Sequence, residues 1–207
     1  MDLWLQIKSM YEKSNKHVRF YEGTEEQGAT DIAKLNVSPD SVFGTIIANT
    51  GGIVVDNWLS ILGQLSYRYA GAADFADRMG LDFGNMLVVA VDVVGGVFAI
   101  NMGRFEEDAG LVWYFAPDTV NWESLKFSYS EFIAWTAQGD LDGFYQAFRW
   151  STWKKDVETI EPFNKGILIY PFLWSKECDV ETASKKAVPL KEIISINMDF
   201  EKKFADS

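Results

Sequence analysis

The chain holds few of the side chains that carry nucleophilic or metal chemistry. His17 is its one histidine and Cys178 its one cysteine, whereas a structural zinc site needs about four such ligands. Ser-His-Asp and Cys-His mechanisms need a histidine oriented by packed neighbours, and His17 lies in a polar N-terminal stretch. Glu177 and Asp179 flank Cys178, and such carboxylates disfavour a reactive thiolate. The sequence therefore predicts no catalytic residue of these kinds, no metal site and no cofactor.

Carboxylates are the remaining chemical resource of the chain. Glu106, Glu107 and Asp108 stand together in RFEEDAG, between two expected strands, without the alternating oxygen ligands of a calcium loop. Glycoside hydrolysis needs only two carboxylates across a cleft, which Asp56, Asp92 and this acidic cluster could supply. The other interpretation of the cluster is a solvated turn.

Aromatic side chains are concentrated in the middle third of the chain. Arg149, Trp150 and Trp153 crowd the segment FRWSTW, where two helices are expected to meet. Such a junction can present a tryptophan edge together with an arginine fork, to a sugar or to a peptide. At strand and helix spacing, aromatic residues equally suit a protein core. The other members of the set are Trp113, Tyr114, Trp122, Trp135 and Tyr145.

The Gly95-Gly96 pair separates two apolar runs in NMLVVAVDVVGGVFAINMG. A phosphate-binding loop would need a helix after its glycines. Residues 97–100 are β-branched or aromatic, apart from Ala99, and therefore favour a strand. We expect a hairpin turn instead, because both glycines accept positive φ. Both runs are apolar on both faces, so this hairpin is expected in the middle of a sheet, with Asp92 as the polar residue at its end.

The elements that must hold these residues follow from periodicity and from capping residues. The fold class expected is α+β, with a mainly antiparallel sheet of about five to seven strands and helices packed against it. Helices are expected at residues 2–13, 38–50, 128–138, 141–148 and 151–161, and residues 71–80 are expected to form a short helix or a surface excursion. Strands are expected at 53–55, 58–62, 86–92, 97–101, 111–115, 166–170 and 194–200, and a polar loop or arm at 14–31.

Length and charge limit the broad class of protein. The 207 residues fit a single domain, with an N-terminal helix plus polar arm at 1–37 and a core at 38–200. The formal net charge of −11 disfavours binding to nucleic acid or to anionic membrane, and it can steer a basic protein partner or simply confer solubility. Because the start lacks the layout of a signal peptide and no long apolar span follows, we expect a cytoplasmic protein.

Six segments between Ser38 and Phe200 occur in one order along most of the chain: TGGIVVDNWLSILG, VVAVDVVGGVFAIN, VWYFAPDTVNWESL, YSEFIAWTAQGDLDGFY, FRWSTWKKDV and ILIYPFLW. Together they resemble a bacterial family of uncharacterised proteins, one of the numbered domains of unknown function. Because that family has no established activity, the resemblance implies no catalytic residue.

The part TGG…VD…LSILG also resembles the SUKH superfamily, whose members include immunity proteins against secreted bacterial toxins. This resemblance implies an α+β scaffold, often acidic, that binds a partner. The segment after Gly63, QLSYRYAGAADFADRMG, stands where the family has a shorter, glycine-containing turn. Any shared site that includes this turn is therefore altered here.

The residues favour two functional hypotheses and leave a third open. The first is a non-enzymatic, acidic partner-binding protein, of the immunity type, that uses aromatic anchors against a basic partner. The alternative is a carboxylate-based hydrolase or a carbohydrate binder, with Asp92 or Asp108 near Trp113 or Trp150. The third is a binder of a small molecule that the sequence does not reveal.

Overall fold

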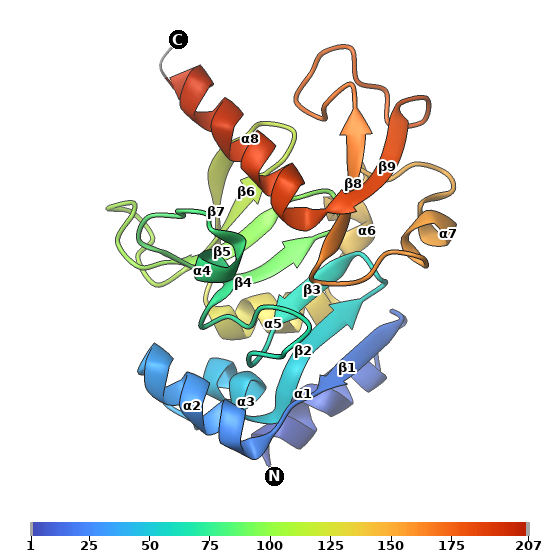
Figure 1. Cartoon of the computed structure of the whole chain (residues 1–207). Coiled ribbons are helices and arrows are strands. Elements are labelled where there is room, and N and C mark those ends of the chain that lie inside the picture. Colours follow the sequence, from blue (N-terminus) through green and yellow to red (C-terminus); the bar gives the residue numbers. More distant parts are fainter. Residues whose placement is uncertain (1, 206–207) are drawn as a thin grey trace.

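A seven-stranded antiparallel sheet runs through the protein, with its strands in chain order (Figure 1). The structure, a computed structural model, describes residues 2–205. The sheet consists of β1 (Val18–Glu22), β2 (Thr50–Val55), β3 (Leu59–Leu62), β4 (Met86–Asp92), β5 (Val97–Asn101), β6 (Val112–Ala116) and β7 (Asn121–Phe127). A second, two-stranded antiparallel sheet pairs β8 (Lys165–Tyr170) with β9 (Ser184–Pro189). The expected α+β class and antiparallel sheet are confirmed.

The Gly95-Gly96 turn joins the strands at the centre of the large sheet. β4 and β5 pair directly, with Val91 opposite Val97, and every residue of β5 is buried. Gly95 has φ of 91°, which favours glycine over a residue with a side chain. The expected hairpin is therefore confirmed, because β-branched and aromatic residues continue the chain as a strand after the glycines.

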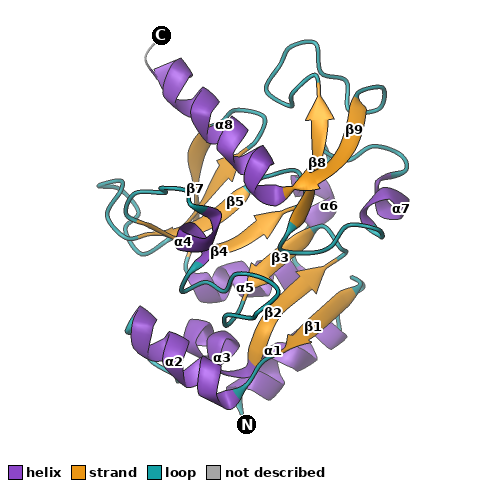
Figure 2. Ribbon diagram, viewed as in Figure 1, coloured by secondary structure: helices purple, strands orange, loops and turns teal. Residues whose placement is uncertain are grey.

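Helices cover both sides of the large sheet (Figure 2). They are α1 (Leu3–Glu12), α2 (Glu25–Leu35), α3 (Val42–Asn49), α4 (Phe75–Met79), α5 (Tyr129–Gln138), α6 (Leu141–Phe144), α7 (Trp153–Val157) and α8 (Leu190–Ala205). Ser128 and Glu131 form the capping box that starts α5. The Phe98 ring of β5 contacts the rings of Phe132 on α5 and Phe144 on α6. On the other side, Glu201 of α8 forms an ion pair with Arg104.

The N-terminal region has the expected helix, as α1, but differs from the expected polar arm. Within residues 14–31, where a loop is expected, the chain forms β1 and begins α2. The alternation in Val18–Glu22 is weak, but β1 pairs along β2 and thereby gains its ladder of hydrogen bonds. The Tyr11 hydroxyl lies 2.6 Å from the Thr136 hydroxyl of α5, in a buried contact. Residues 1–37 are thus packed into the fold as far as they are described, and the prediction of an arm is wrong.

Other boundaries shift for physical reasons. Ser41 rather than Ser38 caps α3, because its hydroxyl accepts a hydrogen bond from the Gly44 N–H. The glycines expected to end this helix, Gly51 and Gly52, lie inside β2. The expected last strand at 194–200 is part of α8, where Leu190, Ile193, Ile194, Asn197 and Met198 are buried at helical spacing.

Candidate functional site

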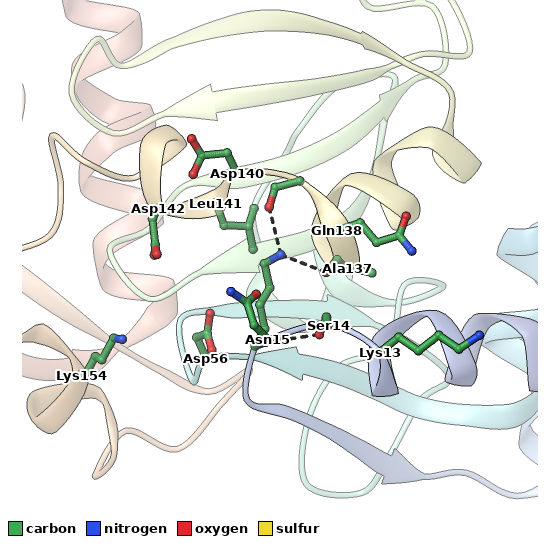
Figure 3. Close-up of a pocket in the computed structure, with 12 residues that line it drawn as sticks. Lys13, Ser14, Asn15, Asp56, Ala137, Gln138, Asp140, Leu141, Asp142 and Lys154 are labelled. Atoms are coloured by element: carbon green, nitrogen blue, oxygen red, sulfur yellow. Dashed lines mark hydrogen bonds between the residues drawn. The ribbon is translucent and has the colours of Figure 1, made fainter.

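A polar cleft opens where the α1–β1 loop, the β2–β3 turn and the α5–α6 junction meet (Figure 3). The cavity has a volume of about 590 Å³. A second cavity of about 420 Å³ adjoins it and shares Asn15, Asp56 and Lys154. We call the first cavity the polar cleft; it is lined by Lys13, Ser14, Asn15, Lys16, Asp56, Ala137, Gln138, Gly139, Asp140, Leu141, Asp142 and Lys154.

Asp56 fixes one wall of the polar cleft. Asp56 and Asn57 form the tight β2–β3 turn, with φ of 54° and 53° respectively. One carboxylate oxygen of Asp56 accepts a hydrogen bond from the His17 N–H at 2.8 Å, and the Asp56 N–H donates to the His17 carbonyl at 2.7 Å. The His17 backbone therefore helps to position the wall, and its imidazole takes no part in these bonds.

The C-terminus of α5 forms the opposite wall and already holds a cation. The Lys16 ammonium donates hydrogen bonds to the carbonyl oxygens of Ala137 and Gly139, each at 2.9 Å (Figure 3). The last carbonyls of a helix carry partial negative charge and lack partners within the helix. This wall of the cleft is therefore an acceptor site that suits an ammonium or guanidinium group.

Two exposed carboxylates continue this wall into α6. Asp140 caps α6, because one of its carboxylate oxygens accepts a hydrogen bond from the Gly143 N–H at 2.8 Å. Asp142 forms an ion pair with Nη1 of Arg149. The two partners differ sharply in exposure, since the Asp142 side chain is 83% exposed and the Arg149 side chain only 6%.

Aromatic rings surround the Arg149 guanidinium behind the cleft. Its central carbon lies 3.9 Å from the Trp153 ring centroid, 4.9 Å from that of Trp58 and 5.1 Å from that of Tyr145. Burial lowers the pKa of Arg149, and the Asp142 charge opposes that shift. Trp150 is only 3% exposed and donates its indole hydrogen bond to Asp156 at 2.5 Å. Of the aromatic residues in FRWSTW, Trp153 is thus the one that lines a cavity.

Asp92 serves the central hairpin rather than the polar cleft. Its Oδ1 accepts hydrogen bonds from the Val94 and Gly96 N–H groups at 3.1 and 2.8 Å, and its Oδ2 accepts one from the Tyr114 hydroxyl at 2.8 Å. A Cβ atom at Gly96 would lie 2.2 Å from Oδ2, so only glycine fits there. Burial raises the pKa of Asp92 to about 6, although these hydrogen bonds pull it downward.

The acidic cluster lies at the other end of β5 from the hairpin turn and the cleft. Glu106 and Glu107 are exposed on the loop between β5 and β6. Asp108 accepts a hydrogen bond from the Ser124 hydroxyl at 2.6 Å and pairs with Lys126 at 3.9 Å. Trp113, which donates to the Asp108 carbonyl oxygen at 3.4 Å, is only 9% exposed.

The structure therefore divides the residues proposed from the sequence. It brings Asp56, Arg149 and Trp153 to the polar cleft and its neighbouring cavity, directly or through Asp142. Trp150 and Asp92 are buried beside them, and Glu106, Glu107 and Asp108 lie apart. Of the carboxylates offered for hydrolysis, Asp56 lines the cleft, whereas Asp92 and the acidic cluster do not.

Sequence reasoning missed Lys16, Asp140, Asp142 and Trp58 as site residues. The segment QGDLDGF gave one usable signal, because an aspartate that caps a helix just after another helix ends places a carboxylate beside free carbonyls. Nothing in the sequence connects residue 16 with residue 139. That contact depends on the tertiary fold.

Metal-holding side-chain groups and membrane-spanning helices are both absent from the described residues. Within residues 2–205, no group of three or more His, Cys, Asp or Glu side chains is placed to hold a metal ion. Among the helices in that range, none combines the length and apolarity needed to cross a membrane.

Comparison with known proteins gives a family for the chain. Residues 2–193 match the family described as "Protein of unknown function DUF2625". The chain belongs to this family. It is 33% identical over 203 residues to "Putative uncharacterized protein YbfG" of Escherichia coli (strain K12), covering 97% of this chain and 93% of that protein. It is 26% identical over 208 residues to an "Uncharacterized protein" of Haemophilus influenzae (strain ATCC 51907 / DSM 11121 / KW20 / Rd), covering 97% and 91% respectively.

No solved structure matches the DUF2625 chain. The resemblance to an uncharacterised bacterial family is confirmed, and the family match reaches further toward the N-terminus than the expected 38–200. The resemblance to the SUKH superfamily stays a prediction.

Proposed function

We propose that this DUF2625 protein is a non-enzymatic binding protein whose polar cleft accepts a basic group of a partner protein. One observation carries the proposal. The α5 carbonyl oxygens of Ala137 and Gly139 already hold the Lys16 ammonium at 2.9 Å, in a cavity whose walls also present Asp56, Asp140 and Asp142. The arrangement suits a second cation, because carbonyl and carboxylate oxygens are the acceptors that ammonium and guanidinium groups use.

The distribution of charge supports a cationic ligand. Figure 3 shows Lys13 and Lys154 at opposite ends of the cleft, while Asp56 and Asp142 lie between them on facing walls. Each of the three aspartates uses one carboxylate oxygen in the hydrogen bonds and ion pair described above. The formal net charge of −11 adds a long-range field that draws a basic protein toward this surface.

An immunity protein that neutralises a secreted toxin would be one form of such binding, as the SUKH resemblance implies. The acidic cluster of Glu106, Glu107 and Asp108 would then offer a second contact, at the other end of β5. The cleft proposal needs neither the immunity role nor this second contact.

The test uses a defined basic probe, an amidated and acetylated tetralysine peptide, measured by titration calorimetry at low and at moderate salt. We expect saturable binding that weakens as salt rises, because rim charges are screened. Replacing Asp140→Asn and Asp142→Asn together should weaken binding about tenfold, through the loss of two charged acceptors. Asparagine keeps the capping function at position 140.

The matched control is the double variant Glu106→Gln with Glu107→Gln, which removes two exposed charges from the far loop. It should bind the tetralysine peptide as the wild type does. Equal weakening of peptide binding in both double variants would show that only the net charge matters. If the wild type does not bind the peptide at all, the proposal is wrong.

A further inference from the structure

Arg149 presents an unused hydrogen-bonding edge in the interior of the protein. Its Nη1 pairs with Asp142, whereas Nε and Nη2 have no hydrogen-bond partner within the described part of the chain. Nε–H and one N–H of Nη2 point the same way and form the side-on edge of the guanidinium. That edge is the one that grips a carboxylate with two parallel hydrogen bonds.

The surrounding rings do not satisfy this edge. Trp153 lies over the guanidinium at 3.9 Å, and a ring in that position stabilises the charge from the face while the in-plane N–H groups stay unpaired. One neighbour repeats the pattern, since Trp58 Nε1 is also buried without a partner in the described part of the chain. The Tyr145 hydroxyl instead faces the Asp92 carboxylate. Burial and the nearby Asp92 charge raise the pKa of Tyr145 well above its usual value, so its hydroxyl stays protonated.

Native proteins satisfy most of their buried polar groups, and a cluster of unpaired donors therefore needs an explanation. Two neighbouring residues here, Arg149 and Trp58, carry such N–H donors, and the central carbon of Arg149 lies 4.9 Å from the Trp58 ring centroid. The acceptor that such a cluster would suit is an oxoanion. A planar carboxylate can lie in the guanidinium plane between the flanking rings, whereas a tetrahedral phosphate would project oxygen atoms out of that plane.

We propose that Arg149 is the receptor for a carboxylate group of a ligand that enters through the polar cleft. Asp142 shows that the guanidinium accepts a carboxylate, since it bonds to Nη1, lines the cleft and has a side chain 83% exposed. Its negative charge opposes a second carboxylate on the neighbouring edge of the guanidinium. Trp153, on the five-residue helix α7, lines the cavity that adjoins the polar cleft. This proposal does not rest on binding of a basic partner.

The experiment titrates the full chain with sodium acetate, against sodium chloride at equal ionic strength. The readout is the Arg Nε–H and Trp indole N–H resonances in proton–nitrogen NMR spectra, with the Trp153 signal assigned from Trp153→Phe. Acetate should shift the signals of Arg149, Trp58 and Trp153 in a saturable way, and sodium phosphate should not. N-acetylglycine compared with acetate then distinguishes a peptide C-terminus from a free organic acid, because N-acetylglycine binds more tightly if a peptide C-terminus is the natural source. N-acetylglycinamide, which has no carboxylate, is the control and should not bind.

Two variants decide the result. Asp142→Asn removes the opposing charge beside the guanidinium and should tighten acetate binding about tenfold. Because the Asp142 side chain is 83% exposed, this variant is expected to fold as the wild type does. Arg149→Lys keeps the charge without the side-on edge and should abolish the saturable shift. Acetate shifts no larger than those of chloride, in both the wild type and Asp142→Asn, would overturn the proposal, as would unchanged acetate binding in a folded Arg149→Lys protein.

Discussion

The buried polar groups at the two ends of strand β5 differ in whether their hydrogen bonds are satisfied. At its C-terminal end, Asn101 is 1% exposed and organises the following loop. Its amide donates to the carbonyl oxygens of Phe105 and Glu107, and its side-chain oxygen accepts from the N–H groups of Gly103, Arg104 and Phe105. Beyond its N-terminal end, next to the polar cleft, the Arg149 side chain is 6% exposed and keeps two nitrogen atoms unpaired within the described residues.

This difference separates scaffold from site. A buried polar group with all its hydrogen bonds made is fully explained by the fold, whereas unpaired buried donors cost stability and call for a partner from outside. The acidic loop looks functional in the sequence, yet its core is a network of satisfied bonds. The residues beside the polar cleft look like ordinary core in the sequence, yet they include the buried donors that lack a hydrogen-bond partner in the described structure. The predictions below test whether that contrast holds.

The largest effect should come from Asn101→Ala. The substitution removes the five side-chain hydrogen bonds of Asn101 and leaves backbone groups of the loop without partners, so we expect a loss of about 4 kcal/mol in the free energy of unfolding. Urea denaturation measures it. Met102→Ala, at a 62% exposed position of the same loop, is the matched control and should change little. A small loss in Asn101→Ala would mean that the loop is held by other contacts.

Asp92→Asn tests the one buried carboxylate at the hairpin turn. Its folded-state pKa of about 6 lies above the ordinary 3.8, so the protonated form favours folding. Its contribution is fully present below about pH 4 and is lost as the pH rises through 6, by about 3 kcal/mol in total. Asparagine keeps the acceptor for the Val94 and Gly96 N–H groups without the charge. The variant should therefore lose less stability between pH 4 and 7 than the wild type, and parallel pH profiles would contradict this.

Arg149→Met, at the other end of β5, should raise the free energy of unfolding, whereas Asn101→Ala should lower it. Methionine fills the same space among Trp58, Tyr145 and Trp153 and removes an incompletely paired buried charge. We therefore expect a gain of about 1 kcal/mol in the free energy of unfolding, at the expense of carboxylate binding. Arg149→Lys, which retains a buried charge, should not show this gain. A loss above about 2 kcal/mol in Arg149→Met would assign the arginine to the scaffold and abolish the contrast.

Much of the scaffold could be predicted because local signals agreed there. The Gly95-Gly96 hairpin, the Asp56-Asn57 turn and the Ser128 capping box each combine a defined turn or cap chemistry with a clear apolar pattern. The segment ISINMDF misled because alternate residues of it, Ile194, Ile196 and Met198, fit a strand, while Ile193, Ile194, Asn197 and Met198 fit a helix. Packing against β8 favours the helix, and periodicity over seven residues does not distinguish the two. Strand β7, rich in polar residues, gave no signal at all.

The site was predictable only in its fragments. FRWSTW lies between two helices, as expected, but the Arg149 and Trp150 side chains are buried there instead of exposed. The Asp56 turn was recognised. Their meeting with Lys16 and Asp142 depends on contacts between segments far apart in sequence. The unpaired edge of Arg149 results from three-dimensional packing, and the spacing of residues in the sequence does not predict it.

The smallest effect should come from the acidic loop itself. Glu106→Gln with Glu107→Gln should change the free energy of unfolding by less than about 0.5 kcal/mol, because both side chains are exposed and Asn101 holds the loop through the Glu107 carbonyl oxygen, not through either carboxylate. Urea denaturation beside Asn101→Ala compares the two kinds of polar group within one loop. A loss of 1 kcal/mol or more would show that the carboxylates belong to the scaffold as well. If stability is unchanged, any effect of this variant on binding a basic partner must come from direct contact, since the loop that presents the charges would still be intact.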